Sequence, residues 1–179
     1  MIWRISGGFT LLLLMLGSGE DLSSTRAFMA PIWSASTEEL ATDFTLKDQF
    51  DKLQVYRFPR DRVTVLAFGD RKGSEQVESW VKPLYQRYKE RVDINGVAVL
   101  DTVPSVARGI VRKVIKAQVK HPVMLDWNGL VAKKYDYTGG AASVVVIDRS
   151  GKILLRNAGA ADEASLNRVY VQIDQLLNK

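Results

Sequence analysis

The chain has 179 residues, of which 46% are hydrophobic, so it is long enough for one domain whose core needs no disulfide or metal. Its formal net charge is +5 and its pI is near 9.5, which permits attraction to anionic surfaces but does not indicate a nucleic-acid partner. The sequence contains no cysteine and one histidine, which excludes disulfides, thiol chemistry and histidine-based metal clusters, although a carboxylate-rich cation site stays open.

Residues 1–19 have the pattern of a secretory signal peptide. Arg4 precedes an apolar run at residues 11–16 that is too short to span a bilayer. We therefore expect export to the periplasm of a Gram-negative-type bacterial envelope, with no transmembrane anchor after cleavage. The alternatives are an uncleaved N-terminal anchor and a wrongly assigned start. Residues 20–41 are rich in small and polar residues and are expected to form a flexible leader into a domain at residues 42–179.

Hydrophobic patterns predict a series of strands. Alternation over residues 44–58 predicts a β-hairpin, and the nearly continuous apolar run at 63–68 predicts a central strand covered on both faces. Residues 92–100 are expected to form a second core strand with a bulge at Gly96. A short strand at 122–126 and a hairpin at 143–155 complete the set.

Four helical patterns alternate with these strands. They fall near residues 77–88, 106–120, 130–135 and 162–179. Ser74 is expected to cap the first helix, with Glu75 at its positive end. In the second helix the aliphatic residues share one face, which is expected to pack on the sheet. Its cations gather on the opposite face, expected to be solvated or, alternatively, to bind an anionic partner: Arg108, Arg112, Lys113, Lys116 and Lys120.

The order of elements predicts an α/β domain with a mixed sheet and helices on both faces. Five stretches then resemble a known family by their order and spacing from about residue 41 to the end: DFTLKD at 43–48, VTVLAF at 63–68, PLYQRY at 83–88, PVMLDWNGLVAKKYDY at 122–137 and VVVIDRSGKIL at 144–154. The chain is similar to thioredoxin-like redoxins, of the branch with alkyl hydroperoxide reductase/thiol-specific antioxidant proteins and exported thiol-disulfide oxidoreductases. This resemblance implies a thioredoxin-like three-layer α/β/α sandwich with a mixed central sheet and an N-terminal β-hairpin.

The sequence departs from that family at the positions that carry its chemistry. Redoxins place a Cys-x-x-Cys, or a peroxidatic cysteine, in the turn after the first core strand, and the matching positions here are Gly73 and Gln76. The family's cis-proline before the edge hairpin corresponds to Ala142, and a cis bond costs a non-proline residue roughly 2.5–4 kcal/mol. The resemblance thus implies a degenerate redox site without oxidoreductase or peroxidase activity.

The same turn offers polar residues for another kind of site. The candidate ligand-binding residues are Asp70, Arg71, Lys72, Ser74 and Glu75. Arg71 and Lys72 beside a helix N-terminus favour a small anion. Ser74 is a candidate nucleophile, with helix capping as its structural alternative.

Aspartates follow several strands and are candidates for a cation site or an acid–base pair. These are Asp70, Asp101, Asp126 and Asp148. Hydrogen bonding to nearby backbone amides is the structural alternative for each of them.

From these features we expect a non-catalytic thioredoxin-fold accessory or binding protein of the periplasm or envelope. Its expected partner is an envelope protein, and no cofactor, metal or nucleic acid is expected. The alternative is a non-thiol enzyme, or a protein that binds a small anion or cation, built on the turn from Asp70 to Glu75.

Overall fold

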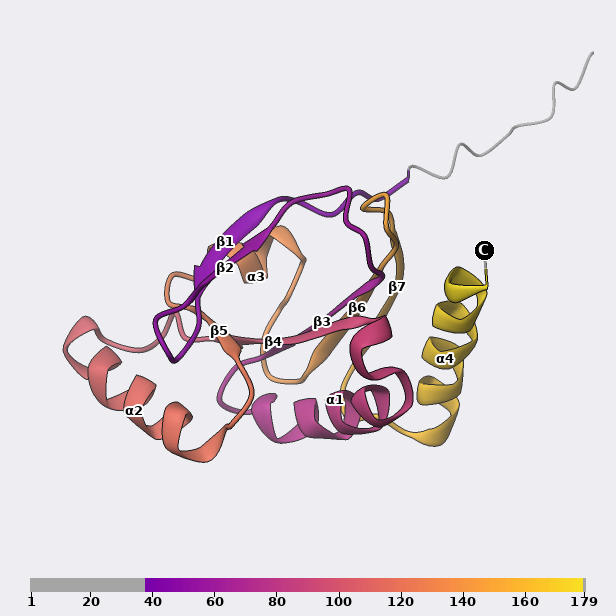
Figure 1. Ribbon diagram of the computed structural model, residues 1–179. Coiled ribbons are helices and arrows are strands. Elements are labelled where there is room, and N and C mark those ends of the chain that lie inside the picture. Colours follow the sequence, from indigo (N-terminus) through magenta and orange to yellow (C-terminus); the bar gives the residue numbers. More distant parts are fainter. Residues whose placement is uncertain (1–37, 179) are drawn as a thin grey trace, which may run out of the picture. The chain divides into compact units, whose positions relative to one another are not determined.

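The computed structural model describes residues 38–178 (Figure 1). The predicted signal peptide and most of the predicted leader lie outside these residues. The elements, in chain order, are β1 (Phe44–Lys47), β2 (Leu53–Tyr56), β3 (Thr64–Gly69), α1 (Ser74–Tyr88), the 3₁₀ turn η1 (Lys89–Arg91), β4 (Asp93–Val99), the 3₁₀ turn η2 (Ser105–Ala107), α2 (Arg108–Gln118), β5 (Val123–Asp126), α3 (Leu130–Lys134), β6 (Ser143–Ile147), β7 (Ile153–Ala158) and α4 (Glu163–Leu177). Within the described part of the chain, no helix is both long and apolar enough to cross a membrane.

The central sheet has five strands in the order β5-β4-β3-β6-β7, and β1 pairs with β2 in a separate antiparallel hairpin. Strands β3, β4 and β5 run parallel, whereas β6 and β7 are antiparallel to their neighbours. The predicted mixed sheet and N-terminal hairpin are therefore confirmed. The predicted bulge at Gly96 is wrong, because Gly96 pairs with Ala67 in an unbroken register between β3 and β4.

The sheet separates two apolar cores because side chains alternate along each strand. On β3, Leu66 and Phe68 enter one core, while Val65 and Ala67 enter the other. Figure 1 shows the β1–β2 hairpin and α3 over the first face, and α1 and α4 over the second. This arrangement gives three layers and buries every residue of β3, as a central strand requires.

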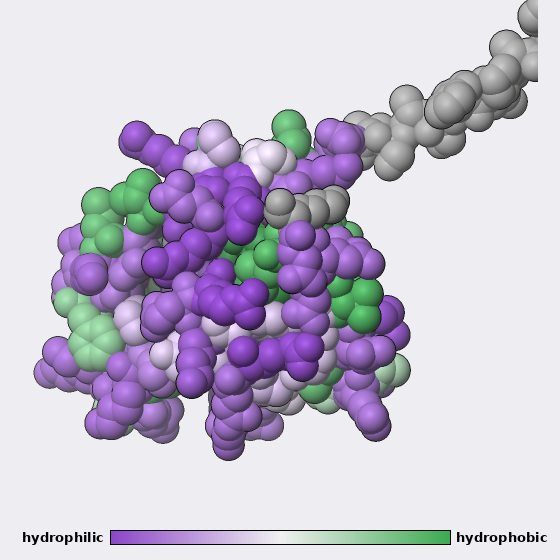
Figure 2. All heavy atoms as spheres, turned by 45° about the vertical axis from the view of Figure 1, so that its right-hand side comes forward, coloured by the Kyte–Doolittle hydropathy of each residue, from purple (hydrophilic) through white to green (hydrophobic). Residues whose placement is uncertain are grey.

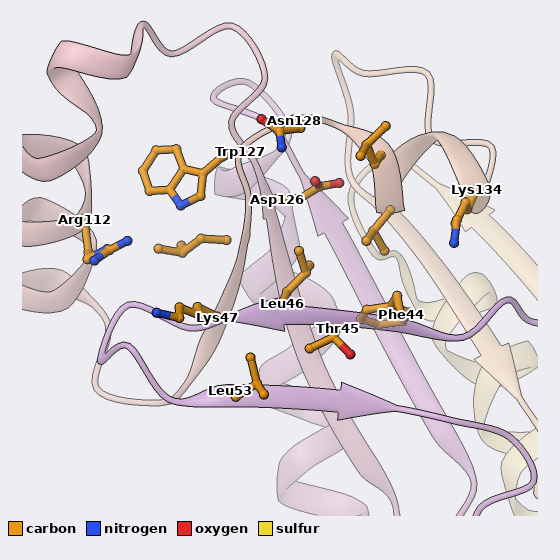
Figure 3. Close-up of a pocket in the computed structure, with 13 residues that line it drawn as sticks. Phe44, Thr45, Leu46, Lys47, Leu53, Arg112, Asp126, Trp127, Asn128 and Lys134 are labelled. Carbon is orange, nitrogen blue, oxygen red and sulfur yellow. The ribbon is translucent and has the colours of Figure 1, made fainter.

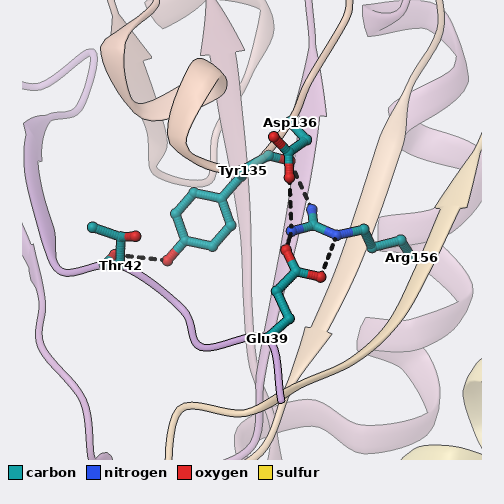
Figure 4. A network of polar contacts seen from close by, with 5 residues as sticks. All are labelled: Glu39, Thr42, Tyr135, Asp136 and Arg156. Carbon is teal, nitrogen blue, oxygen red and sulfur yellow. Dashed lines mark hydrogen bonds and ion pairs between the residues drawn. The ribbon is translucent and has the colours of Figure 1, made fainter. Parts of the chain in front are cut away.

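A polar network attaches the start of the described chain to the sheet (Figure 4). The Arg156 side chain of β7 donates to the Glu39 carboxylate and, at 2.7 Å, to the carbonyl oxygen of Tyr135. Asp136 lies 3.6 Å from the same guanidinium, and the Tyr135 hydroxyl donates to the carbonyl of Thr42 at 2.8 Å. These contacts thus hold Glu39 and Thr42 against the folded domain.

Helix α2 does not bury its aliphatic face as predicted. None of its residues is buried, and of the aliphatic side chains expected against the sheet, Ile110 is 68% exposed and Val114 47%, while Val111 is half-buried. The arginines of the supposedly solvated face instead contact the domain, with Arg112 bound to Asp51. Figure 2 shows one face of the molecule, which is mostly hydrophilic. Hydrophobic residues occupy small separate areas of that face, as is usual for a protein surface.

Candidate functional site

The turn between β3 and α1 lies at the carboxyl edge of the parallel strands, the usual place for ligand sites in α/β sheets. Its conformation is fixed by Asp70. One Asp70 carboxylate oxygen accepts the N–H groups of Lys72 and Gly73 at 3.0 and 2.7 Å, and the other accepts the N–H of Gly140 at 2.8 Å. The Asp70 N–H in turn donates to the Tyr137 hydroxyl at 2.8 Å. Asp70 therefore joins the turn to the loop that precedes β6.

Burial raises the pKa of Asp70, but the hydrogen bonds from the N–H groups of Gly140, Gly73 and Lys72 outweigh it and leave the pKa below its ordinary value. Asp70 is consequently an ionised acceptor at neutral pH. A general base needs a higher pKa and a free lone pair, so this carboxylate is poorly suited to that role.

The three degenerate redox positions lie together. A methyl group at Gly73 would lie 2.6 Å from the carbonyl carbon and oxygen of Ala141 and 2.9 Å from the nitrogen of Ala142. The Gln76 side-chain oxygen accepts the N–H of Ala142 at 3.0 Å. Backbone thus fills the space that a side chain at position 73 would need.

The remaining candidate residues of the turn are exposed: Arg71, Lys72, Ser74 and Glu75. The Ser74 hydroxyl donates to the carbonyl of Arg71 at 3.0 Å. The prediction that Ser74 caps α1 is wrong. Gly73, which has no side chain to cap with, occupies the cap position, and Ser74 is the first helical residue. The amides nearest the helix start are held by Asp70, which leaves fewer of them for an external anion.

A groove of about 610 Å³ lies beside this turn, at the carboxyl ends of β3 and β4. Its polar lining includes Asp70, Asp101, Lys133, Asp136 and Tyr137. Burial raises the pKa of Tyr137, so its phenol stays protonated. The groove is the concave surface at the edge where the sequence placed the site.

The four predicted aspartates do not converge. Asp70 and Asp101 line this groove, but Asp126 is buried and accepts the N–H of Ala132 at 2.8 Å. Asp148 binds Ser150 and the N–H of Lys152 in the β6–β7 turn. That turn is at the other edge of the sheet, because β6 runs antiparallel to β3. Within residues 38–178, no group of three or more side chains is placed to hold a metal ion.

Sequence reasoning missed a second groove, of about 440 Å³, between the β1–β2 hairpin, α2 and α3 (Figure 3). Figure 3 shows Arg112 extending from α2 toward a space that Trp127, Lys47 and Leu53 also line. Its walls are mostly apolar and three cations, at Lys47, Arg112 and Lys134, stand around it. In the sequence, the one signal for this groove was Trp127 in the turn that follows the strand at 122–126. The hairpin and the helix that complete the groove are far away in the chain, so no local pattern indicates it.

Comparison with known proteins gives structural matches only. No family model matches the chain, and neither does any curated protein. A proposed thiol:disulfide interchange protein DsbE from Chlorobium tepidum is 26% identical, with a TM-score of 0.60 over 78% of this chain and 96% of that one. The exposed lipoprotein thioredoxin Etrx1 from Streptococcus pneumoniae is 15% identical, with a TM-score of 0.60 over 73% and 99%. StoA from Bacillus subtilis is 16% identical, with a TM-score of 0.57 over 72% and 96%.

The five-stranded mixed sheet, the N-terminal hairpin and these matches define the class: the chain has the thioredoxin-like redoxin fold. Within that class it lacks the defining chemistry. With no cysteine anywhere in its sequence, it has no dithiol redox site.

Proposed function

We propose that this chain is a non-catalytic binding or accessory protein of the bacterial periplasm or envelope, and that it binds a protein partner at the edge where redoxins keep their thiols. The observation that carries the proposal is the packing of Gly73 against Ala141. A lost active site under no constraint would leave a gap where the sulfur had been. Here the gap is filled by backbone and held by Asp70 and Gln76, which makes the edge a rigid surface.

Rigidity supports binding because a preorganised surface loses less conformational entropy on association. The adjacent groove supplies charged and aromatic groups, Asp101, Lys133 and Tyr137, next to the locked turn. The proposed partner presents groups that complement these. The enzyme alternative has less support, since Asp70 is occupied by backbone donors and Ser74 bonds a backbone carbonyl.

Site-specific photocrosslinking in a bacterium that exports the full chain tests the proposal. A photoreactive amino acid replaces Thr138, which is exposed and lines the groove, or Asn167, which is exposed on α4, as the matched control. We expect one adduct of defined mass from position 138 in the periplasmic fraction, its loss on Lys133→Glu, and no such adduct from position 167. Identical adducts from both positions, or none from either, would contradict the proposal.

A turnover assay separates binding from catalysis. The purified chain is expected to show no disulfide reductase or peroxidase activity, because it has no thiol. Intrinsic turnover in either assay would overturn the non-catalytic assignment. If another activity were found, the variants Asp70→Ala and Ser74→Ala would decide whether the turn is responsible.

A further inference from the structure

Helix α2 is held on the domain by its cations. Three of them are spaced one turn apart and contact residues outside the helix; Arg108, Arg112 and Lys116 form what we call the inward stripe. The Arg108 guanidinium lies 5.5 Å from the centre of the Trp127 ring and donates to the Trp127 carbonyl at 3.2 Å. Arg112 donates to both carboxylate oxygens of Asp51 at 2.8 and 2.9 Å. Figure 3 shows Arg112 on the side of α2 that faces the hairpin.

The third member of the inward stripe, Lys116, has its ammonium 5.5 Å from the centre of the Phe50 ring. Phe50 and Asp51 both belong to the β1–β2 connection. The inward stripe thus joins α2 to two separate parts of the domain, the hairpin connection and the turn after β5. The orientation of the helix about its own axis is fixed by these contacts.

The opposite side of the helix presents aliphatic side chains to solvent. Ile110 and Val114 of α2, with Val106 of the preceding η2 turn, form an outward stripe, and Val106, Ile110 and Val114 are 90%, 68% and 47% exposed. Ile110 and Val114 each precede a member of the inward stripe by two residues, which is about 200° around a helix. Ala117 lies on the same side and is exposed, since seven residues bring it within about 20° of Ile110.

An amphipathic helix usually buries its aliphatic stripe, but here only Val111 and Ile115 are half-buried and the outward stripe is left open. The three exposed residues of the outward stripe follow one another at helical spacing, unlike isolated surface residues. Figure 1 shows α2 at the periphery of the domain, beyond the β5 edge of the sheet, so the outward stripe is accessible. An apolar partner surface would stabilise α2 by removing the outward stripe from water.

The positive charge of α2 restricts which kind of partner can cover the outward stripe. Residues 104–121 contain five cations and no Asp or Glu. Two copies of α2 packed on each other would bring Lys113 of each copy near that of the other, without a carboxylate from either helix to compensate. A typical protein–protein interface uses about 20 to 30 residues on each side, far more than the outward stripe offers.

We propose that α2 binds the surface of a membrane that contains anionic lipid. In this arrangement the outward stripe enters the boundary between headgroups and acyl chains, and Lys113 and Lys120, both exposed, contact lipid phosphates. Long lysine side chains can reach the headgroups while their methylenes stay at the apolar boundary. The proposed membrane-binding surface shares no residue with the turn and groove around Gly73 and Ala142, where a protein partner is proposed to bind. The two proposals are therefore independent.

Vesicle sedimentation tests the affinity. The full chain is incubated with vesicles of phosphatidylcholine alone, or with vesicles in which about 30 mol% of the lipid is anionic phosphatidylglycerol. The double variant Ile110→Ser/Val114→Ser is expected to bind the anionic vesicles at least tenfold more weakly than the unmodified chain. Val171→Ser, at an exposed valine of α4, is the matched control and should bind normally. Lys113→Glu should weaken binding at low salt, whereas Arg168→Glu on α4 should not.

A spin label reads the position of α2 directly and does not depend on any other part of the chain. Because the chain has no cysteine, Ala117→Cys, beside the outward stripe, and Arg168→Cys can each be labelled at a single site. With anionic vesicles, the label at 117 should gain accessibility to oxygen and lose it to a polar nickel reagent, and the label at 168 should not change. An unchanged label at 117, equal binding to both vesicle types, or a dimer in solution that Ile110→Ser dissociates would overturn the proposal.

Discussion

Replacing Gly73, the N-cap residue of α1, by alanine should destabilise the domain. The backbone at Gly73 has φ −73° and ψ −21°, which any residue adopts, so the penalty comes mainly from the new methyl group, with a smaller cost because alanine is a poorer N-cap than glycine. That group would lie 2.6 Å from two backbone atoms of Ala141. Overpacking of this kind costs about 1–3 kcal/mol, and the reduced entropy of the unfolded chain returns about 0.4–1 kcal/mol. We expect the upper part of the range to apply, because the loop is held by Asp70 and Gln76.

The net loss for Gly73→Ala is then about 2 kcal/mol, which corresponds to a decrease in Tm of roughly 4–8 °C. Urea and thermal denaturation followed by circular dichroism measure both quantities. Gly109→Ala is the matched control: it adds the same methyl group to a helix where nothing lies within 4 Å, and it should stabilise by up to about 1 kcal/mol. If Gly73→Ala proved as stable as the unmodified protein, the reasoning about the filled redox position would be refuted.

Three further substitutions test other parts of the structure by denaturation. Asp70→Asn should cost about 1–2 kcal/mol at pH 7, because the amide turns a donor toward backbone N–H groups. Folding lowers the pKa of Asp70, so the stability that its carboxylate provides is present above the unfolded pKa of about 3.9 and is lost as the pH falls through the folded pKa. The free energy of unfolding of Asp70→Asn should therefore vary less with pH below about pH 4 than that of the unmodified protein. The same pH dependence in both proteins would count against this role. Trp80→Phe should cost about 2–3 kcal/mol, since it removes a buried indole whose N–H donates to the Gly159 carbonyl at 2.8 Å; a loss below about 0.5 kcal/mol would contradict that contact. Arg156→Lys should cost about 1 kcal/mol or less, because the two-pronged contact with Glu39 is partly exposed, and a loss of several kcal/mol would show that the network is more deeply coupled than its geometry indicates.

Most of the fold could be predicted from the sequence because its signals are local. The apolar run at 63–68 predicted a central strand, and every residue of β3 is buried. The turn at 149–151 between two apolar runs predicted the β6–β7 hairpin, which is present. The bulge at Gly96 was wrong because glycine also fits a regular strand, and only the register with Ala67 distinguishes the two.

The amphipathic pattern of α2 determined that the helix has two faces but not which of them meets the protein. That choice depended on Asp51 and Trp127, distant in sequence, which provide a carboxylate and an aromatic ring for the arginines. Hydrophobic periodicity contains no information about such neighbours. The two arginines of the predicted solvated face therefore pack on the domain, whereas Lys113, Lys116 and Lys120 of that face are exposed.

For the candidate site, the sequence alone determined what is absent: without cysteine there is no thiol chemistry, whatever the fold. Only the tertiary structure decided what replaced it. The contact of Gly73 with Ala141 and the hydrogen bond from the Gly140 N–H to Asp70 join segments about 70 residues apart, and they exist because β3 and β6 are neighbours in the sheet. A short-range pattern can specify the residues at each strand end, but packing of the complete sheet is needed to bring those ends into contact.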